Sequence, residues 1–175
     1  LQTLAQGAEL LNAPAEVQFG IITPYPDEWN SFHSNQNSTG IYATQDSTTQ
    51  DLLHALVNWA HNNKGDKQSV LLLIDDLESF IKLNQRAEQD LRWLLLRGPS
   101  RRVWPIITIN SSRVQNIKGW LGSFRTRLFG CTQDSNDAQL LTGNSKSTLN
   151  QLISGSQFTM REGNNWLNFW VPSID

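Results

Sequence analysis

The sequence predicts an α/β fold with a mainly parallel sheet that helices cover on both faces. Short apolar runs rich in β-branched residues alternate with segments of helical period, which is typical of strands joined by crossover helices. The last segment, QFTMREGNNWLNFWVP, instead predicts an antiparallel hairpin. The 175 residues suffice for one sizeable core, so we expect a single domain over residues 1–175.

The first half of the chain alternates helices and strands. Helical period predicts a helix over 1–11, and the apolar run VQFGIIT predicts a buried strand over 17–23. The polar stretch 31–47 indicates a long loop or a partly helical excursion. A helix over 51–62 follows, and SVLLLID at 69–75, the most apolar run of the chain, is expected to form a central strand.

The second half continues this order and ends in the hairpin. The elements expected there are a helix over about 83–97, a strand over 103–109, a shorter strand over 128–131, a helix in at least the second half of 138–153, and two strands joined by a turn at 163–165. Because proline cannot donate a hydrogen bond to a neighbouring strand, we expect the strand over 103–109 to start after Pro105.

Composition excludes several classes of protein. With 14 basic and 16 acidic residues the formal charge is -2, so the whole chain lacks the basic footprint of a dedicated nucleic-acid-binding module. One cysteine, Cys131, and three scattered histidines exclude an internal disulfide framework and offer no zinc-type spacing. No apolar run is long enough to span a bilayer, and no targeting segment follows Leu1.

The strongest chemical pattern is LLLIDD, an apolar strand that ends in Asp75 and Asp76. A carboxylate at the exposed end of a buried strand can orient a hydrated Mg2+ beside a nucleotide, and a second carboxylate can polarise the attacking water. This is the logic of a Walker B motif. The alternative is that both aspartates end the strand and cap the next helix.

Further candidates lie after the following strands. Asn110 is placed where a neutral side chain could sense a terminal phosphate, although an Asn-Ser turn explains it equally. Arg127, or less favourably Arg125, could reach a phosphoryl group across a subunit boundary, or could form a surface ion pair. No glycine-rich phosphate loop is present. The lookalike LLTGNSKSTL has a serine before Lys146 where glycine belongs, so we interpret it as a helix start or loop.

Several segments, in this order, resemble the later part of FtsK/SpoIIIE/HerA-type P-loop ATPases, which are ring-forming DNA translocases and pumping ATPases. They are VLLLIDD, RGPSRRVWPIITIN, NIKGWLGSFRTRLFG and QLISGSQFTMREGN. The resemblance implies a three-layer RecA-like P-loop NTPase fold with a C-terminal antiparallel hairpin. It also implies that residues 1–11 are the helix after the phosphate loop, so that the domain is incomplete at its N-terminus and lacks the Walker A loop.

The resemblance further implies ATP and Mg2+ as cofactors, with Asp75 at the metal, Asp76 on the water, Asn110 as sensor and Arg127 acting on a neighbouring subunit. It implies a homo-oligomeric ring, a hexamer, with DNA as a possible partner, in the cytoplasm or on the cytoplasmic face of a membrane. Two positions depart from the family pattern, since Asp76 replaces a glutamate and Asn110 a glutamine. Without the phosphate loop, this stretch alone is expected to be inactive.

Two other interpretations stay open. The departures at Asp76 and Asn110 favour a degenerate ATPase-like interaction module of a multi-domain export or scaffold protein. In the other, LLLIDD is accidental in an unrelated α/β domain, and no helix should then begin at Leu1 against this strand. A DNA motor would need cations facing a pore, for which Lys82 and Lys118 are candidates together with Arg113.

Overall fold

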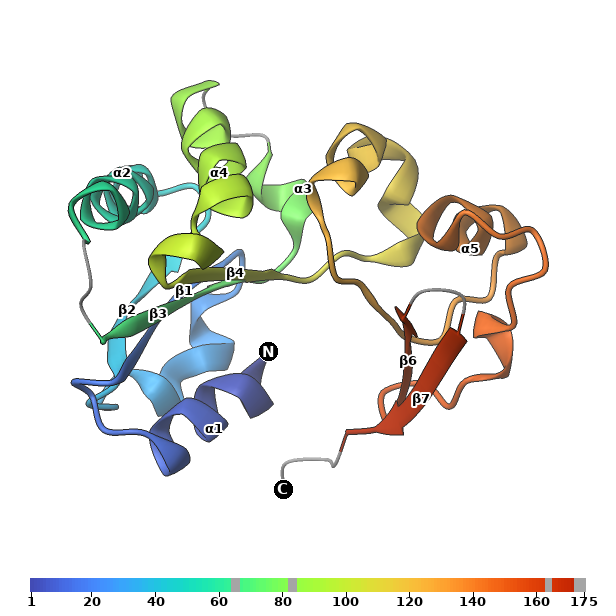
Figure 1. The fold of residues 1–175 in the computed structure, drawn as a ribbon, viewed down its shortest axis with the longest axis horizontal. Coiled ribbons are helices and arrows are strands. Elements are labelled where there is room, and N and C mark those ends of the chain that lie inside the picture. The colour runs from blue at the N-terminus through green and yellow to red at the C-terminus, as the bar shows by residue number, and fades with distance from the viewer. Residues whose placement is uncertain (64–66, 82–84, 163–164, 172–175) are drawn as a thin grey trace. The chain divides into compact units, whose positions relative to one another are not determined.

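The computed structural model describes residues 1–63, 67–81, 85–162 and 165–171 (Figure 1). Its backbone contacts divide the chain into two compact units, Leu1–Ile109 and Asn110–Asp175. The single domain expected over residues 1–175 stays a prediction.

The first unit is built on a four-stranded parallel sheet in the order β2-β1-β3-β4 (Figure 1). Its strands are β1 (Val17–Thr23), β2 (Ser38–Ala43), β3 (Ser69–Ile74) and β4 (Val103–Ile107). Its helices are α1 (Gln2–Leu11), α2 (Ser47–Asn62), α3 (Leu77–Phe80) and α4 (Gln85–Arg97), with short 3₁₀ segments η1 (Pro26–Phe32) and η2 (Pro99–Arg101). The central strand predicted from SVLLLID is β3, and β1 coincides with its predicted range.

Helices cover both faces of this sheet. On one face, Ala5 and Ala8 of α1 pack in one buried cluster with Phe19 of β1 and Leu73 of β3. On the opposite face, α2 and α4 pack side by side (Figure 1). The helix α1 thus begins beside Leu1 and packs against the LLLIDD strand. This arrangement contradicts the interpretation in which LLLIDD is accidental in an unrelated α/β domain.

The stretch 31–47, predicted to be a long loop or a partly helical excursion, instead contains the strand β2. The strand pairs in parallel with β1 at the edge of the sheet, and its six residues are all at least partly exposed. An edge strand of this kind lacks the apolar run of a central strand, so its pattern resembles that of a polar loop. Gly40, with φ +137, adds a backbone conformation that β-branched residues avoid.

The expectation that the strand starts after Pro105 was also wrong, since β4 begins at Val103. The Arg102 carbonyl accepts from the Val70 N–H, and the Thr108 N–H donates to the Ile74 carbonyl. The backbone N–H and C=O groups of the even-numbered residues of β4 therefore point toward β3. The nitrogen of Pro105 therefore points away from β3, and the missing donor costs no hydrogen bond on that side of the strand.

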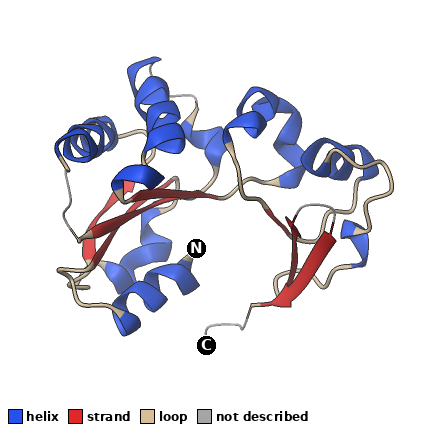
Figure 2. Ribbon diagram, viewed as in Figure 1, coloured by secondary structure: helices blue, strands red, loops and turns tan. Residues whose placement is uncertain are grey.

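The second unit contains an antiparallel sheet in the order β5-β6-β7 (Figure 2). Its elements are η3 (Ser111–Ser123), β5 (Leu128–Phe129), α5 (Ser135–Thr142), η4 (Leu149–Gln151), β6 (Gln157–Glu162) and β7 (Asn165–Trp170). The predicted C-terminal hairpin is confirmed, although part of its turn, 163–164, lies outside the described residues. A small core of Phe129, Ala138 and Leu149 holds the sheet to α5 and η4.

Two boundaries in this unit differ from the prediction. The strand expected over 128–131 stops at Phe129. The helix expected in the second half of 138–153 lies at its beginning, because Asp134 caps α5 by accepting from the Asn136 and Asp137 N–H groups at 2.8 and 3.0 Å. Gly143, with φ +71, then ends the helix. Among the described residues, no helix combines the length and apolar character needed to cross a membrane.

Candidate functional site

The carboxyl ends of three neighbouring strands bring a carboxylate and two hydroxyl groups together. Asp75 directly follows β3, Thr23 ends β1, and Thr108 directly follows β4. The Thr108 hydroxyl donates to Asp75 Oδ1 at 2.8 Å, and the Thr23 hydroxyl is 3.4 Å from Oδ2. The Asp75 N–H donates to the Ile22 carbonyl at 2.8 Å, which continues the β1 ladder. The half-buried carboxylate is therefore fixed from both sides.

Thr108 also holds the backbone of the second aspartate. Its Oγ1 accepts from the Asp76 N–H at 2.9 Å while its hydrogen is donated to Asp75. One hydroxyl thus uses its donor and one lone pair to connect β4 with both aspartates. The residue pattern singles out the aspartates alone. What marks Thr23 and Thr108 in the sequence is that each is a threonine at the end of a predicted strand.

Asp76 begins the short helix α3 and caps it. Its Oδ1 accepts from the Glu78 N–H at 3.2 Å and its Oδ2 from the Ser79 hydroxyl at 2.7 Å. Its backbone has φ +63, a left-handed conformation that non-glycine residues seldom adopt and that aspartate and asparagine tolerate best. The capping role foreseen as an alternative is present.

The amino end of α1 also lies in the electrostatic field of Asp75. Burial lowers the pKa of the Leu1 amino group below its usual 8.0, and the negative charge of Asp75 opposes that shift.

The donor set of this corner suits Mg2+. Mg2+ prefers oxygen ligands, keeps several of its waters and is usually held by one or two carboxylates. Asp75 supplies one carboxylate, and the two threonine hydroxyls orient it. Throughout the described ranges, no group of three or more histidine, cysteine, aspartate or glutamate residues could enclose a metal ion by itself. The residues fit a hydrated ion held jointly with a phosphate.

Asn110 and Arg127 belong to the second unit. Asn110 is exposed, and its Oδ1 accepts from the N–H and hydroxyl of Ser112 at 3.1 and 2.9 Å, as in the turn that the sequence offers as an alternative. The half-buried Arg127 donates to the carbonyls of Leu141 and Leu121 at 2.8 and 2.6 Å, so it connects α5 with η3. Arg125 is exposed.

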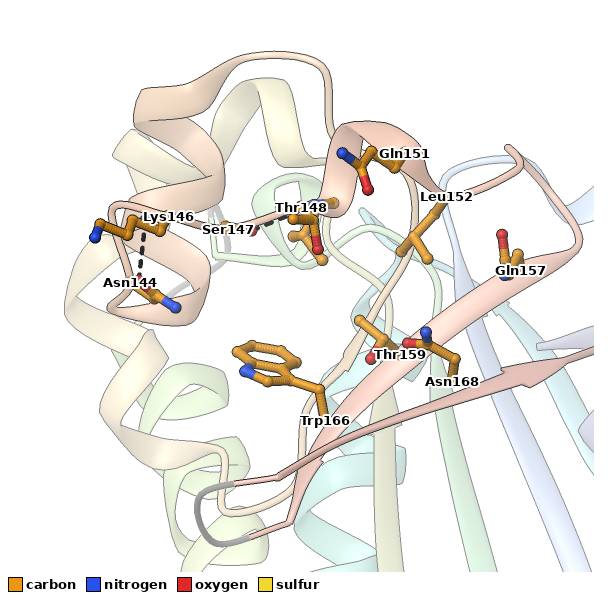
Figure 3. Close-up of a pocket in the computed structure, with 11 residues that line it drawn as sticks. Asn144, Lys146, Ser147, Thr148, Gln151, Leu152, Gln157, Thr159, Trp166 and Asn168 are labelled. Atoms are coloured by element: carbon orange, nitrogen blue, oxygen red, sulfur yellow. Dashed lines mark hydrogen bonds between the residues drawn. The ribbon is translucent and has the colours of Figure 1, made fainter.

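The phosphate-loop lookalike forms one wall of a pocket in the second unit, with a volume of about 420 Å³ (Figure 3). Its residues form a loop as predicted, since Thr142 ends α5 and the Lys146 N–H donates to Asn144 Oδ1 at 2.9 Å. The hairpin forms the other wall, from which Trp166 and Asn168 of β7 line the pocket. The lining is mostly of neutral polar groups, and the sequence pattern did not indicate it.

Neither a protein-family model nor a curated protein matches the sequence. Solved structures match its fold. The pCW3 conjugation coupling protein TcpA, in its monomer form with ATPγS, aligns over 89% of this chain and 52% of its own, with 12% identity and a TM-score of 0.70. The cytoplasmic domain of the type VII secretion ATPase EccC from Thermomonospora curvata aligns over 99% of this chain and 24% of its own, with 9% identity and a TM-score of 0.75.

A smaller neighbour is the genome packaging NTPase B204 from Sulfolobus turreted icosahedral virus 2, in complex with AMPPCP. It aligns over 91% of this chain and 85% of its own, with 14% identity and a TM-score of 0.57. This chain thus spans about half of TcpA and a quarter of the EccC domain. At these identities the likeness concerns the fold. The chain has the fold of these ATPase domains, and this is the RecA-like fold that its sequence predicts.

Proposed function

We propose that this chain is part of an ATP-driven translocase, an FtsK/HerA-like motor that couples ATP hydrolysis to the movement of DNA or another polymer. The observation that carries the proposal is the carboxylate of Asp75, held by hydroxyls from Thr23 and Thr108 at the carboxyl ends of a parallel RecA-like sheet. In open α/β sheets, ligands bind at this edge. The neighbouring coupling protein and packaging NTPase are nucleotide complexes of this fold.

The proposed roles follow from what each side chain contacts. When bound, Mg2+ neutralises charge on the phosphates of ATP. Asp75 orients the waters of that ion, and the hydroxyls of Thr23 and Thr108 fix the direction of its carboxylate. Asp76, whose carboxylate also caps α3, accepts a hydrogen bond from the attacking water.

Two residues of the second unit complete the proposal. Asn110, two positions beyond Thr108 in the chain, senses the terminal phosphate through its amide group. Arg127 contributes to a neighbouring subunit's site, and its hydrogen bonds to the carbonyls of η3 and α5 must then open. Alternatively, these hydrogen bonds stay closed and position the exposed Arg125 to take that role. These roles require a homo-oligomeric ring, which we propose to be a hexamer. We place it in the cytoplasm or at the cytoplasmic face of a membrane, by analogy with the cytoplasmic domain of EccC.

The test compares this chain with a polypeptide extended upstream of Leu1. The 175 residues contain no glycine-rich loop with its lysine, so we expect no ATP hydrolysis from this chain alone. The extended polypeptide should hydrolyse ATP, and Asp75→Asn should abolish the hydrolysis while Asp51→Asn, an exposed change on α2, leaves it intact. Hydrolysis by the 175-residue chain that Asp75→Asn abolishes would contradict this account.

The second candidate is a degenerate ATPase-like module that serves as an interaction platform. The observation in its favour is that both carboxylate oxygens of Asp76 are used to cap α3. The upstream sequence discriminates between the two. An intact glycine-rich loop that ends in lysine and serine or threonine supports the motor, whereas a broken loop and an extended polypeptide without ATPase activity support the platform.

A further inference from the structure

The strand β7 has an edge that no strand covers in the part of the chain that the structure describes. It is the last strand in the order β5-β6-β7. Its sequence, NWLNFW, contains no charged residue and no proline, the devices that normally protect an exposed edge. Trp166, Leu167 and Trp170 are 38%, 52% and 60% exposed. A neutral, aromatic, open edge of this length is a template for pairing with another strand.

The hydrogen-bonding pattern tells which backbone groups are open. The Val171 N–H donates to the Ser156 carbonyl at 2.9 Å, in register with the β6–β7 pairing. Because the bonds alternate along an antiparallel pair, odd-numbered residues of β7 face β6. The N–H and C=O groups of Trp166, Asn168 and Trp170 therefore point to the open edge.

The sequence of β7 is symmetric about its open groups. Around Asn168 the residues read Trp-Leu-Asn-Phe-Trp, so each side of Asn168 presents an aliphatic or aromatic residue and then a tryptophan. In an antiparallel pair of two such strands centred on Asn168, Trp166 lies opposite Trp170 of the other copy, and Leu167 lies opposite Phe169. The two Asn168 residues face each other. No like charges meet, and aromatic cross-strand pairs add stability.

We propose that β7 pairs antiparallel with β7 of a second copy of this chain, around a two-fold axis at Asn168. The two antiparallel sheets then form one continuous sheet, in which every open N–H and C=O of Trp166, Asn168 and Trp170 is bonded. The side chains of Trp166 and Asn168 line the pocket of the second unit (Figure 3). Because Trp170 of the other copy lies opposite Trp166, the pairing also places it at the rim of that pocket.

This contact differs from the contact that builds a ring. A two-fold contact uses the same surface on both copies and closes at two, whereas a ring needs two different surfaces. The β7 contact also needs neither nucleotide nor Asp75. Its test is therefore independent of the proposed ATPase function.

The first experiment is sedimentation equilibrium of this chain over a range of concentrations, and we expect a reversible dimer. Asn168→Lys should weaken dimerisation by about tenfold or more, because it sets two like charges opposite each other on the two-fold axis. The backbone N–H of residue 168 is not used by β6, so the variant should keep the circular dichroism of the parent. Asn150→Lys, the same change at an exposed site in η4, should leave the dimer unchanged.

The second experiment detects the register directly. In a Cys131→Ser background, Asn168→Cys should form a covalent dimer on mild oxidation. The Cα atoms of facing residues in a hydrogen-bonded pair lie about 5.5 Å apart, which is within the Cα–Cα range of disulfides. Asn150→Cys should not. A monomer at every concentration, a dimer that Asn168→Lys leaves intact, or equal cross-linking of both cysteine variants would each overturn the proposal. Loss of the dimer on Asp75→Asn with an intact β7 would do so as well.

Discussion

Thr108 is the residue on which the geometry of the candidate site depends. Its hydroxyl donates to Asp75 Oδ1 and accepts from the Asp76 N–H. Thr108→Val keeps the shape of the side chain, but the Asp76 N–H and Asp75 Oδ1 lose their hydrogen bonds to the Thr108 hydroxyl. We expect the free energy of unfolding to fall by about 1–3 kcal/mol, measured by urea unfolding. Thr108→Ser should recover most of that loss.

A matched control separates this effect from the general cost of a threonine-to-valine change. Thr126 is exposed in the loop before β5, so Thr126→Val should change stability by no more than about 0.5 kcal/mol. If Thr108→Val costs as little as Thr126→Val, the hydroxyl does not hold the two aspartates together.

Asp76 combines a helix cap with a left-handed backbone, and substitutions separate the two. Asp76→Asn retains an acceptor and tolerates φ +63, so it should be the mildest change. Asp76→Gly loses the cap but accepts the backbone, and Asp76→Ala loses the cap and is strained. We expect stability in the order Asn, Gly, Ala, with alanine about 2 kcal/mol below the parent in thermal unfolding.

Asp134 provides the comparison for that series. It caps α5 with φ -77, where alanine meets no left-handed strain. The stability difference between glycine and alanine should therefore be smaller at Asp134 than at Asp76. An equal difference at both positions would mean that the backbone at Asp76 is unstrained.

At the scale of elements, Gly98 sets the turn from α4 into β4. A Cβ there would overlap the Leu94 carbonyl oxygen and lie 2.7 Å from that of Val103. Both are backbone atoms, and both carbonyls belong to elements that the core fixes. Gly98→Ala should therefore destabilise the protein by about 3 kcal/mol or more, measured by thermal unfolding. At Gly122, where a Cβ meets nothing within 4 Å, alanine should be tolerated.

The same scale shows what the sequence could predict. Buried strands such as β1 and β3 have continuous apolar runs, so their positions follow from the residues. The prediction missed the edge strand β2 and placed the start of the edge strand β4 too late. Among the described residues, one side of each strand has no neighbouring strand, so β2 can contain polar residues and β4 can contain Pro105. In the candidate site, Asp75 was predictable from its place after β3. The roles of Thr23 and Thr108 depend on strand register, which distant pairing decides.

For the whole molecule, the formal charge of -2 gives no general attraction to DNA, so any DNA contact must come from local cations. Lys82 lies outside the described residues, whereas Arg113 and Lys118 are exposed on η3. If these two contact phosphates, duplex DNA should bind more weakly as salt rises, and the slope of log K against log salt should fall by about two when both become glutamine. Fluorescence anisotropy of a labelled duplex at several salt concentrations measures this slope.

A charge-matched control decides whether η3 is specific. Lys67 and Arg97 are exposed cations of the first unit, and changing both to glutamine alters the net charge by the same amount. We expect the Lys67 and Arg97 double variant to leave the slope nearly unchanged. The slope counts the counterions that direct phosphate contacts release, whereas salt screens charges that lie more than a Debye length from the DNA. An affinity without salt dependence, or equal slopes for the two double variants, would exclude η3 as a phosphate-tracking surface. A protein would then be the better candidate for the polymer that the proposed motor moves.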